Sequence, residues 1–548
     1  MKKLFMLLLI PQICYGVVYN VGPGEAYTAF ASFHAAVTVM PGDIADGGGN
    51  TFFEQIVVNG DGLELNPVTY RNFRVTGASV LGEWTGPDVN GEYYIATPTD
   101  VAGGNNVEIV IKDGIIVNRA ADNSYGSLSA GYWAEDTVHK RIYYKPDGDM
   151  SHVFEAGSGN LICLAGHDYI RLSSCTVYGG ANGIQSTTTA TTNKVFGLQV
   201  DSCTISNFYG HGIQIYSSDG TDVENCIVSY CQKGGVKLGG LLAAINVTGD
   251  NATVKSNRFY RNGWAHVAYD SEEHVIDIMP YSASPLITQN IISESGYVGG
   301  RVYTDVLSAG TCISVDGVDN FTISSNYLVD NYNGCIVFGP DTNYAGTGGI
   351  ISRNVFYHNG LAGVDSGSRS NKLRVICSKN DVGSACNAAV SILNNTFCNN
   401  QGSVGTFNNC AADIFLAGAS DISGLVIKNN IHYENANKAD FRVYTENGAI
   451  SYTEDNNLYY RSSPADYLAI GGLINTTCYP VTNSFSDFML ATGGANSINV
   501  DPLFVSSTDF HLTQNSPARG AASDGGDIGA YEYKDTTPPA PPTVINIE

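Results

Sequence analysis

Ionisable side chains gather most densely between residues 264 and 305 of this chain. The members of this group are His266, Asp270, Glu272, Glu273, His274, Asp277, Glu294, Arg301 and Asp305. Carboxylates provide the hard oxygen ligands that Ca²⁺ prefers, and histidines and carboxylates are common acid–base catalysts. The group therefore predicts a site of acid–base chemistry, with Ca²⁺ as a candidate cofactor held by Asp270, Asp277 and Asp316.

Two cationic residues point to elimination chemistry. β-Elimination from a uronate sugar needs a base that removes a proton and a positive charge that stabilises the developing anion. Lys237 could act as the base if burial or a neighbouring cation lowered its pKa, and Arg301 could neutralise the substrate carboxylate. His211 and His266 are further candidate catalytic residues.

The same residues are also compatible with two other functions. Glycoside hydrolysis needs two carboxyl groups roughly 5 to 10 Å apart, and Asp270, Asp277 and Asp316 could supply them. A solenoid that only binds glycans would need no carboxylate cluster, so the acidic group argues against it. A polysaccharide lyase is the preferred interpretation, a glycoside hydrolase the second, and a non-catalytic glycan-binding protein the third.

A short pattern, in which Asn or Ser precedes alternating β-forming residues, recurs ten times along the chain. It is marked by Ser174, Ser202, Asn225, Asn257, Asn290, Asn326, Asn354, Asn395, Asn430 and Asn457, at intervals of 23 to 41 residues. Variable intervals above a short minimum are typical of a fixed coil that carries loops of different length. The pattern predicts a right-handed parallel β-helix, an all-β solenoid whose asparagines form a ladder along the axis.

A second motif follows about ten residues later and reads NGIQS, HGIQI, GGVKL, NGCIV and AGVDS. Side chains alternate across a strand, so the apolar residue of each motif should point inward and its successor outward. The expected inward residues are Ile184, Ile213, Val236, Ile313 and Ile336, and the expected outward residues are Gln185, Gln214, Lys237, Ser314 and Val337. The outward row predicts a trough in which Gln214, Tyr216, Trp264 and Asp365 bind substrate between walls formed by 264–290 and 295–312.

The first residues resemble a secretory signal peptide, because Lys2 and Lys3 precede a short apolar stretch and Gly16 offers a small residue for cleavage. The boundaries of the other segments are inferred from where the repeat begins, where it is interrupted and where it ends. The expected boundaries are a signal peptide at 1–16, a β-helix domain at 17–534 with a helical cap over 26–37, a β-rich insertion at about 81–165, a C-terminal cap at about 462–534, and a proline-rich tail at 535–548.

The formal net charge of −24 disfavours nucleic acid and anionic membranes as partners. Beyond the first residues, no apolar run reaches the length of a membrane-spanning helix. We therefore expect the mature protein to be a soluble, exported monomer whose partner is a polysaccharide.

The chain has 13 cysteines. Cys175, Cys203 and Cys226 fall at one repeat position, and Cys312 and Cys335 at another, so we expect them to stack as small buried residues instead of forming disulfides. The best disulfide candidate is Cys377 with Cys386. No CxxC spacing occurs, which argues against a zinc site.

The opening segments VGPGEAYTAF, VMPGDIADGGGNTF and NPVTYRNF, and the closing segment NVDPLFVSSTDFHLTQNSPARGAASDGGDIGAYEY, resemble secreted bacterial β-helix proteins of the pectate-lyase-like superfamily. Together with the ladder, the resemblance covers most of residues 17–534. It implies the right-handed parallel β-helix and an exported protein. It does not imply one reaction, because the superfamily holds lyases, hydrolases, esterases, epimerases and adhesins.

The sequence departs from two branches of that superfamily. The chondroitinase- and alginate-lyase-like branch carries an arginine on the strand one coil after its lysine, and Ala268 stands at about that place here. The segment YGHGIQIYSSDG around His211 resembles the Gly-His-Gly segment of polygalacturonases, but the other motifs of that family do not occur here in order.

Overall fold

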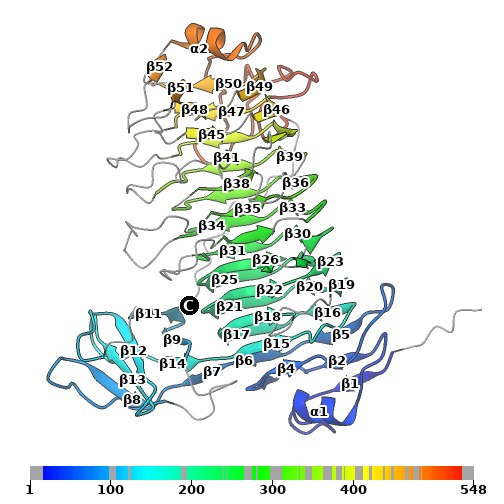
Figure 1. Ribbon diagram of the computed structural model, residues 1–548, viewed down its shortest axis with the longest axis vertical. Helices are drawn as coiled ribbons and strands as arrows, with labels where there is room; N and C mark the ends of the chain where they lie inside the picture. Colours follow the sequence, from blue (N-terminus) through cyan, green and yellow to red (C-terminus); the bar gives the residue numbers. More distant parts are fainter. Residues whose placement is uncertain are drawn as a thin grey trace, which may run out of the picture.

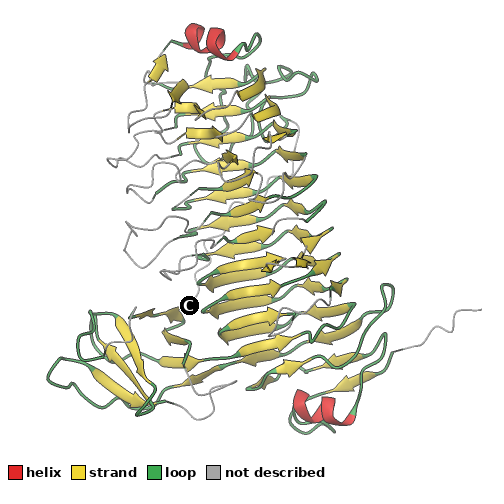
Figure 2. Cartoon of the chain, viewed as in Figure 1, coloured by secondary structure: helices red, strands yellow, loops and turns green. Residues whose placement is uncertain are grey.

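The computed structural model is a long column of stacked coils (Figure 1). It describes residues 16–97, 107–120, 125–186, 194–238, 240–242, 245–247, 249–263, 274–278, 282–296, 311–332, 334–339, 348–361, 373–377, 386–387, 389–400, 412–418, 422–435, 439–445, 450–462, 468–472, 480–482 and 484–533. Each coil places one short strand in each of three parallel sheets, in the order sheet 1, sheet 2, sheet 3. Figure 2 shows that strands and loops make up almost all of the column.

Sheet 1 has 14 strands within the described residues. They are β1 (Val18–Asn20), β2 (Ile44–Asp46), β5 (Val68–Arg71), β16 (Ile170–Ser173), β20 (Gln199–Asp201), β24 (Asp222–Glu224), β30 (Thr253–Lys255), β33 (Leu286–Thr288), β36 (Phe321–Ser324), β39 (Gly349–Ser352), β42 (Cys386–Asn387), β43 (Val390–Leu393), β46 (Ile422–Lys428) and β49 (Ile450–Asp455).

Sheet 2 has 12 strands in the described part of the chain. They are β3 (Thr51–Phe52), β6 (Arg74–Thr76), β17 (Thr176–Gly180), β21 (Thr204–Phe208), β25 (Ile227–Cys231), β31 (Arg258–Tyr260), β34 (Ile291–Ser293), β37 (Tyr327–Val329), β40 (Val355–Tyr357), β44 (Thr396–Cys398), β47 (Ile431–Tyr433) and β50 (Leu458–Tyr460).

Sheet 3 has 13 strands among the residues that the structure describes. They are β4 (Ile56–Val57), β15 (Asn160–Cys163), β18 (Asn182–Gln185), β22 (His211–Ile215), β26 (Gly234–Leu238), β32 (Ile276–Ile278), β35 (Ile313–Asp316), β38 (Ile336–Gly339), β41 (Leu373–Cys377), β45 (Ala412–Gly418), β48 (Ala439–Thr445), β51 (Leu468–Gly472) and β52 (Pro480–Thr482). Smaller sheets join β19 (Val195–Phe196), β23 (Ser218–Asp219) and β29 (Gly249–Asp250), and β27 (Gly240–Leu242) with β28 (Ile245–Val247).

The interior of the column is one continuous apolar core. A strand of three to five residues cannot bury its apolar side chains alone, so the core forms only when coils stack. All five predicted inward residues, Ile184, Ile213, Val236, Ile313 and Ile336, are fully buried in it. The predicted fold class, a right-handed parallel β-helix, is confirmed.

Buried asparagines form the predicted ladder just before the strands of sheet 2. Its members are Asn257, Asn290, Asn326, Asn354, Asn395, Asn430 and Asn457. Each of the first six donates from Nδ2 to Oδ1 of the next asparagine at 2.9–3.1 Å. The Nδ2 group also donates to a backbone carbonyl, as Asn326 does to Ile287, so the turn carbonyls inside the column are satisfied.

The ladder corrects the predicted alignment of its first three members. Sheet 2 pairs Ile227 with Arg258, so Cys226 occupies the place of Asn257, and Asn225 lies one residue earlier. Ser174, Ser202 and Asn225 adopt positive φ angles of 54° to 56° in the turn instead. Cys175, Cys203 and Cys226 are free, buried thiols that continue the stack, as predicted; so are Cys312 and Cys335. The side chains of Cys377 and Cys386 lie outside the described residues.

Helices close both ends of the core. Helix α1 (Phe30–Ala36) buries Phe30 and Phe33 against the first coils, in the region where a cap is predicted. Helix α2 (Phe485–Thr492) is N-capped by Ser484 and places Phe488 on Tyr459 of the last coil, with ring centroids 4.9 Å apart. The segment after α2 returns along the outside of sheet 2, where Leu512 and Ile528 pack on Ile431.

The region between β6 and β15 forms a small β-rich body that projects from the N-terminal end of the column (Figure 1). Its strands are β7 (Ala78–Val80), β8 (Tyr93–Ala96), β9 (Ile109–Lys112), β10 (Ile115–Ile116), β11 (Asn118–Arg119), β12 (Tyr132–Asp136), β13 (Arg141–Lys145) and β14 (Phe154–Gly157). They form two four-stranded sheets around a separate core that contains Trp133 and Phe154.

Candidate functional site

The outer side of sheet 3 carries a row of polar side chains from consecutive coils. The strand registers align Gln185 with Gln214, Gln214 with Lys237, Lys237 with Asp277, and Asp277 with Ser314. Gln185, Gln214, Lys237 and Ser314 each follow an inward apolar residue, as predicted, and the register adds Asp277 to the row. The row is nevertheless enclosed, because Gln185, Asp277 and Ser314 are buried and Gln214 and Lys237 are half-buried.

Lys237 and Asp277 form an ion pair between strands β26 and β32. The distance from Nζ to Oδ2 is 3.1 Å, and the side chains are 16% and 4% exposed. Directly paired residues on parallel strands share a face and lie about 4.8 Å apart, so the register brings the two groups together. Each charge compensates the other, because an unpaired ion at such low hydration would cost several kcal/mol.

The ion pair bears on the predicted base role of Lys237. That role requires burial or a neighbouring cation to lower the pKa of the amine. The structure supplies burial, but the group in contact with Lys237 is a carboxylate. The contact is therefore with an anion and not with the neighbouring cation that the base role could have used.

The same ion pair bears on the predicted calcium site. A carboxylate that already contacts an ammonium group offers a poor place for a second cation, so Asp277 does not fit the role of a calcium ligand. Asp316 lies at the end of β35, two residues beyond Ser314, the partner of Asp277. Asp270 lies outside the described residues.

The register also corrects two predictions about the neighbourhood of Lys237. The residue one coil after Lys237 is Asp277, and Ala268 does not hold that place. The segment 264–290 is not wholly a cleft wall, because β32 and β33 within it belong to the column. Long loops of unequal length hide the register, so counting residues along the chain misplaced the coil.

His211 lies on the neighbouring strand β22. Its side chain is buried, and its Nε2 atom has no hydrogen-bond partner. Its backbone N–H donates to Oδ1 of Asn182 at 2.9 Å, which fixes the start of the strand. Burial lowers the pKa of His211 well below its usual value, and the positive charges of Lys237 and Lys233, together with His274, lower it further. His211 is therefore a neutral imidazole.

Gly234 makes room for this histidine. His211 pairs with Gly234 on the next strand. A Cβ atom at position 234 would lie 2.1 Å from the carbonyl oxygen of His274 and 3.2 Å from Cδ2 of His211. Because Cδ2 is bonded to Nε2, this edge of the ring is directed toward β26, the strand that carries Lys237.

A polar group of the outer row itself, on strand β18, is also unsatisfied. The Nε2 amide of Gln185 is buried and makes no hydrogen bond. Tyr216, predicted to bind substrate, is half-buried just beyond β22, and its backbone N–H donates to Oγ of Ser186 at 3.1 Å. Buried polar atoms without partners are uncommon and need an explanation such as a ligand or water.

The structure therefore places Lys237, Asp277, His211 and Gln214 on three adjoining strands, with Tyr216 just beyond the end of β22. It does not describe the other predicted site residues, which are Arg301, His266, Asp270, Trp264 and Asp365. For Asp316 it describes only the backbone.

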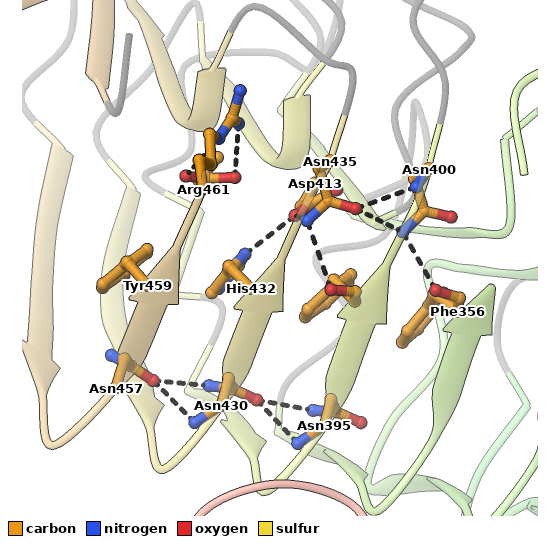
Figure 3. A network of polar contacts seen from close by, with 12 residues as sticks. Phe356, Asn395, Asn400, Asp413, Asn430, His432, Asn435, Asn457, Tyr459 and Arg461 are labelled. Carbon is orange, nitrogen blue, oxygen red and sulfur yellow. Dashed lines mark hydrogen bonds and ion pairs between the residues drawn. The ribbon is translucent and has the colours of Figure 1, made fainter. Parts of the chain in front are cut away.

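A second asparagine ladder, which the sequence analysis missed, ends in a buried polar network (Figure 3). Asn331, Asn359 and Asn400 each donate to the next asparagine, and Asn435 donates to Oδ2 of Asp413 at 2.6 Å. His432 contacts the same carboxylate oxygen through Nδ1 at 2.9 Å. The signal was present in the sequence, because each of these asparagines stands five residues after a member of the first ladder.

Asp413, His432 and Asp440 are the one group of metal-ligating side chains found among the described residues, with ligand atoms within 4.8 Å of one another. Arg461 holds both carboxylate oxygens of Asp440, at 3.2 Å from Nε and 2.5 Å from Nη2. Asp440 is thus paired with Arg461, and Asp413 is held by His432 and Asn435, so both carboxylates already have partners inside the protein.

Residues 151–307 match the model of a family described as a right-handed β-helix region. No curated protein matches the chain. Neither helix of the described chain has the length and apolar character that crossing a lipid bilayer requires.

Several solved structures are similar to the chain at low identity. A protein described as a glycoside hydrolase is 9% identical with a TM-score of 0.43, and the match covers 79% of this chain and 97% of that one. The pectate lyase Pel9A is 14% identical with a TM-score of 0.36, covering 95% and 97%. A PL6-family polysaccharide lyase from Pseudopedobacter saltans is 12% identical with a TM-score of 0.37, covering 81% and 92%. These likenesses agree with the β-helix fold and do not indicate which reaction the chain performs.

Proposed function

We propose that this protein is an exported polysaccharide lyase that cleaves a uronate-containing polymer by β-elimination. The observation that carries the proposal is the Lys237–Asp277 ion pair on the outer row of sheet 3, together with His211 at the start of the neighbouring strand β22, whose buried Nε2 has no hydrogen-bond partner. The pair offers a fixed positive charge, and the histidine offers a proton acceptor, which are the two groups that elimination from a uronate needs.

The row runs along the axis of the column, so an extended polymer can contact successive coils. Gln214 pairs with Lys237 and Tyr216 lies two residues further along the chain, and both would contact the sugar units next to the one that reacts. Arg301, His266, Trp264 and Asp365 remain proposed contributors on the sequence evidence alone. Export rests on the signal-like residues 1–16.

Glycoside hydrolysis is the alternative. It needs a pair of carboxyl groups across the scissile bond, one of them protonated. Among the described side chains of this row, Asp277 is the only carboxylate, and it is engaged by Lys237. This arrangement favours elimination over hydrolysis. A non-catalytic glycan-binding role would require no neutral histidine beside the cation.

The purified protein should be incubated with pectate, alginate and glycosaminoglycans while ultraviolet absorbance and reducing ends are followed together. Elimination creates an unsaturated sugar that absorbs, whereas hydrolysis raises reducing ends alone and binding changes neither. We expect absorbance to rise with at least one polymer. Reducing ends without absorbance would replace the lyase by a hydrolase.

Calcium is a separate part of the proposal. With Asp277 engaged by Lys237, Asp270 and Asp316 would be its protein ligands. Activity before and after treatment with a calcium chelator, with restoration by added Ca²⁺, tests it. Full activity in the chelator would remove Ca²⁺ from the proposal without affecting the elimination.

A further inference from the structure

We propose that His211 is the base of the elimination and that Lys237, held in place by Asp277, is the cation that binds the substrate carboxylate. This assignment rests on the proposed function and reverses the role that the sequence suggested for Lys237. It follows from which partners the two side chains have in the folded protein.

The ammonium group of Lys237 forms an ion pair, whereas the Nε2 atom of His211 makes no hydrogen bond. The ammonium group contacts Oδ2 of Asp277 at 3.1 Å, which favours its charged state and fixes its position. His211 is only 6% exposed, so water does not reach its Nε2 atom freely, and this atom has no hydrogen-bond partner. A base needs a free lone pair, and in this pair of residues the histidine has it.

Burial and the charges around His211 keep the imidazole unprotonated in the resting protein. Lys237 on β26, Lys233 just before that strand and His274 just before β32 all disfavour the protonated imidazole, and so does burial. When a substrate carboxylate approaches Lys237, its negative charge makes protonation of His211 easier during the reaction.

The step balances with solvent as the only co-reactant. The C5 proton of the uronate passes to Nε2 of His211, and the C5–H electron pair forms the C4=C5 double bond. The bond between C4 and the glycosidic oxygen breaks. That oxygen keeps the bonding electrons and takes a proton from water, and the histidinium later returns its proton to solvent.

The test compares His211→Ala and His211→Gln with Lys237→Met and Lys237→Arg, and uses His139→Ala as a control at an exposed histidine of the projecting body. The His211 variants should lose about 10² to 10⁴-fold in kcat with little change in KM. Lys237→Met should raise KM by about 10- to 100-fold, and Lys237→Arg should recover part of that loss. Circular dichroism and thermal melting establish that each variant folds, and the glutamine variant serves if the alanine variant does not.

Two further measurements separate a base from a merely structural residue. Added imidazole should restore turnover to His211→Ala, with a pH profile that follows the titration of free imidazole. Wild-type kcat/KM should persist below pH 6.5, because the pKa of His211 is lowered. A His211→Ala variant that keeps kcat within threefold of wild type overturns the assignment while the lyase activity stands. A wild-type protein that releases no unsaturated product overturns both.

Discussion

The Nδ2 group of Asn435 donates a 2.6 Å hydrogen bond to Oδ2 of Asp413, so the second asparagine ladder ends on a carboxylate. The first ladder ends in the same way, because Asn457 donates to Oε1 of Glu454 at 2.7 Å. Within both ladders, the hydrogen bond from each asparagine to the next asparagine runs toward the C-terminal end. Aligned amide dipoles place partial positive charge at that end, and a carboxylate there stabilises them much as charges stabilise helix ends.

Neutralising a terminal carboxylate should therefore destabilise the C-terminal coils. Glu454→Gln keeps the size of the side chain but removes the charge that accepts from Asn457 and from Oγ of Ser497. We expect a loss of about 1 to 3 kcal/mol in chemical denaturation. Glu64→Gln at an exposed position is the control. Equal stability of the two variants would show that the ladder does not need a charged end.

Replacing an asparagine inside the ladder should lower the free energy of unfolding further than neutralising the terminal carboxylate. Asn354 donates to Ile323 and Asn395 and accepts from Asn326, so Asn354→Ala leaves several buried polar groups without partners. The expected loss is about 2 to 4 kcal/mol by urea denaturation. Asn225→Gly is the matched control, because Asn225 is exposed in the turn and glycine tolerates its φ of 56°. The control should change stability by no more than about 0.5 kcal/mol.

Removing one partner of the ion pair on sheet 3 should destabilise the protein more than replacing both partners with apolar residues. Asp277→Ala leaves Lys237 poorly hydrated and without its partner, so we expect a loss of about 3 kcal/mol. The double variant Lys237→Met with Asp277→Leu should recover most of that stability while keeping the raised KM expected for Lys237→Met. Denaturation curves and the absorbance assay measure the two effects. A double variant as unstable as the single one would contradict the account.

Gly234 should tolerate no side chain. A Cβ atom there would lie 2.1 Å from the backbone oxygen of His274, so Gly234→Ala forces the strands apart and moves the ring of His211. We expect a destabilisation of about 1 to 3 kcal/mol, seen as a lower melting temperature, together with reduced turnover. Gly148→Ala, where a Cβ would meet nothing within 4 Å, should behave as wild type. Unchanged turnover in Gly234→Ala would argue against the placement of His211.

The N-terminal cap should make stability depend on pH. Burial lowers the pKa of His34 from 6.5 to about 4, and its Nε2 lies 2.9 Å from the hydroxyl of Tyr70. The unfolded chain then binds more protons than the folded one between these values, so the stabilisation is complete above pH 6.5 and is lost as pH falls toward 4. The partly buried ring should contribute about 2 kcal/mol after allowance for solvent screening. In His34→Gln, the fall in unfolding free energy between pH 6.5 and 4 should be smaller by that amount; an identical pH dependence would refute the prediction.

Much of the column could be predicted because its determinants are local. The alternation in NGIQS and HGIQI identified Ile184 and Ile213 as core residues, since a period of two along one strand fixes which side chain points inward. The repeated asparagines revealed the coil for a similar reason. The second ladder has an equally local signal, because an asparagine stands five residues after a member of the first ladder, as Asn359 does after Asn354. The predicted repeat did not include that second asparagine.

By itself the sequence determined the coil, its inward residues and an outward row that contains Gln185, Gln214 and Lys237. Only the tertiary structure decided that Asp277 stands beside Lys237 and that Nε2 of His211 has no partner. The physical reason is the loops: contacts between coils depend on the register of strands that are separated by loops of unequal length. No local period records that register, and it appears only when the strands pair.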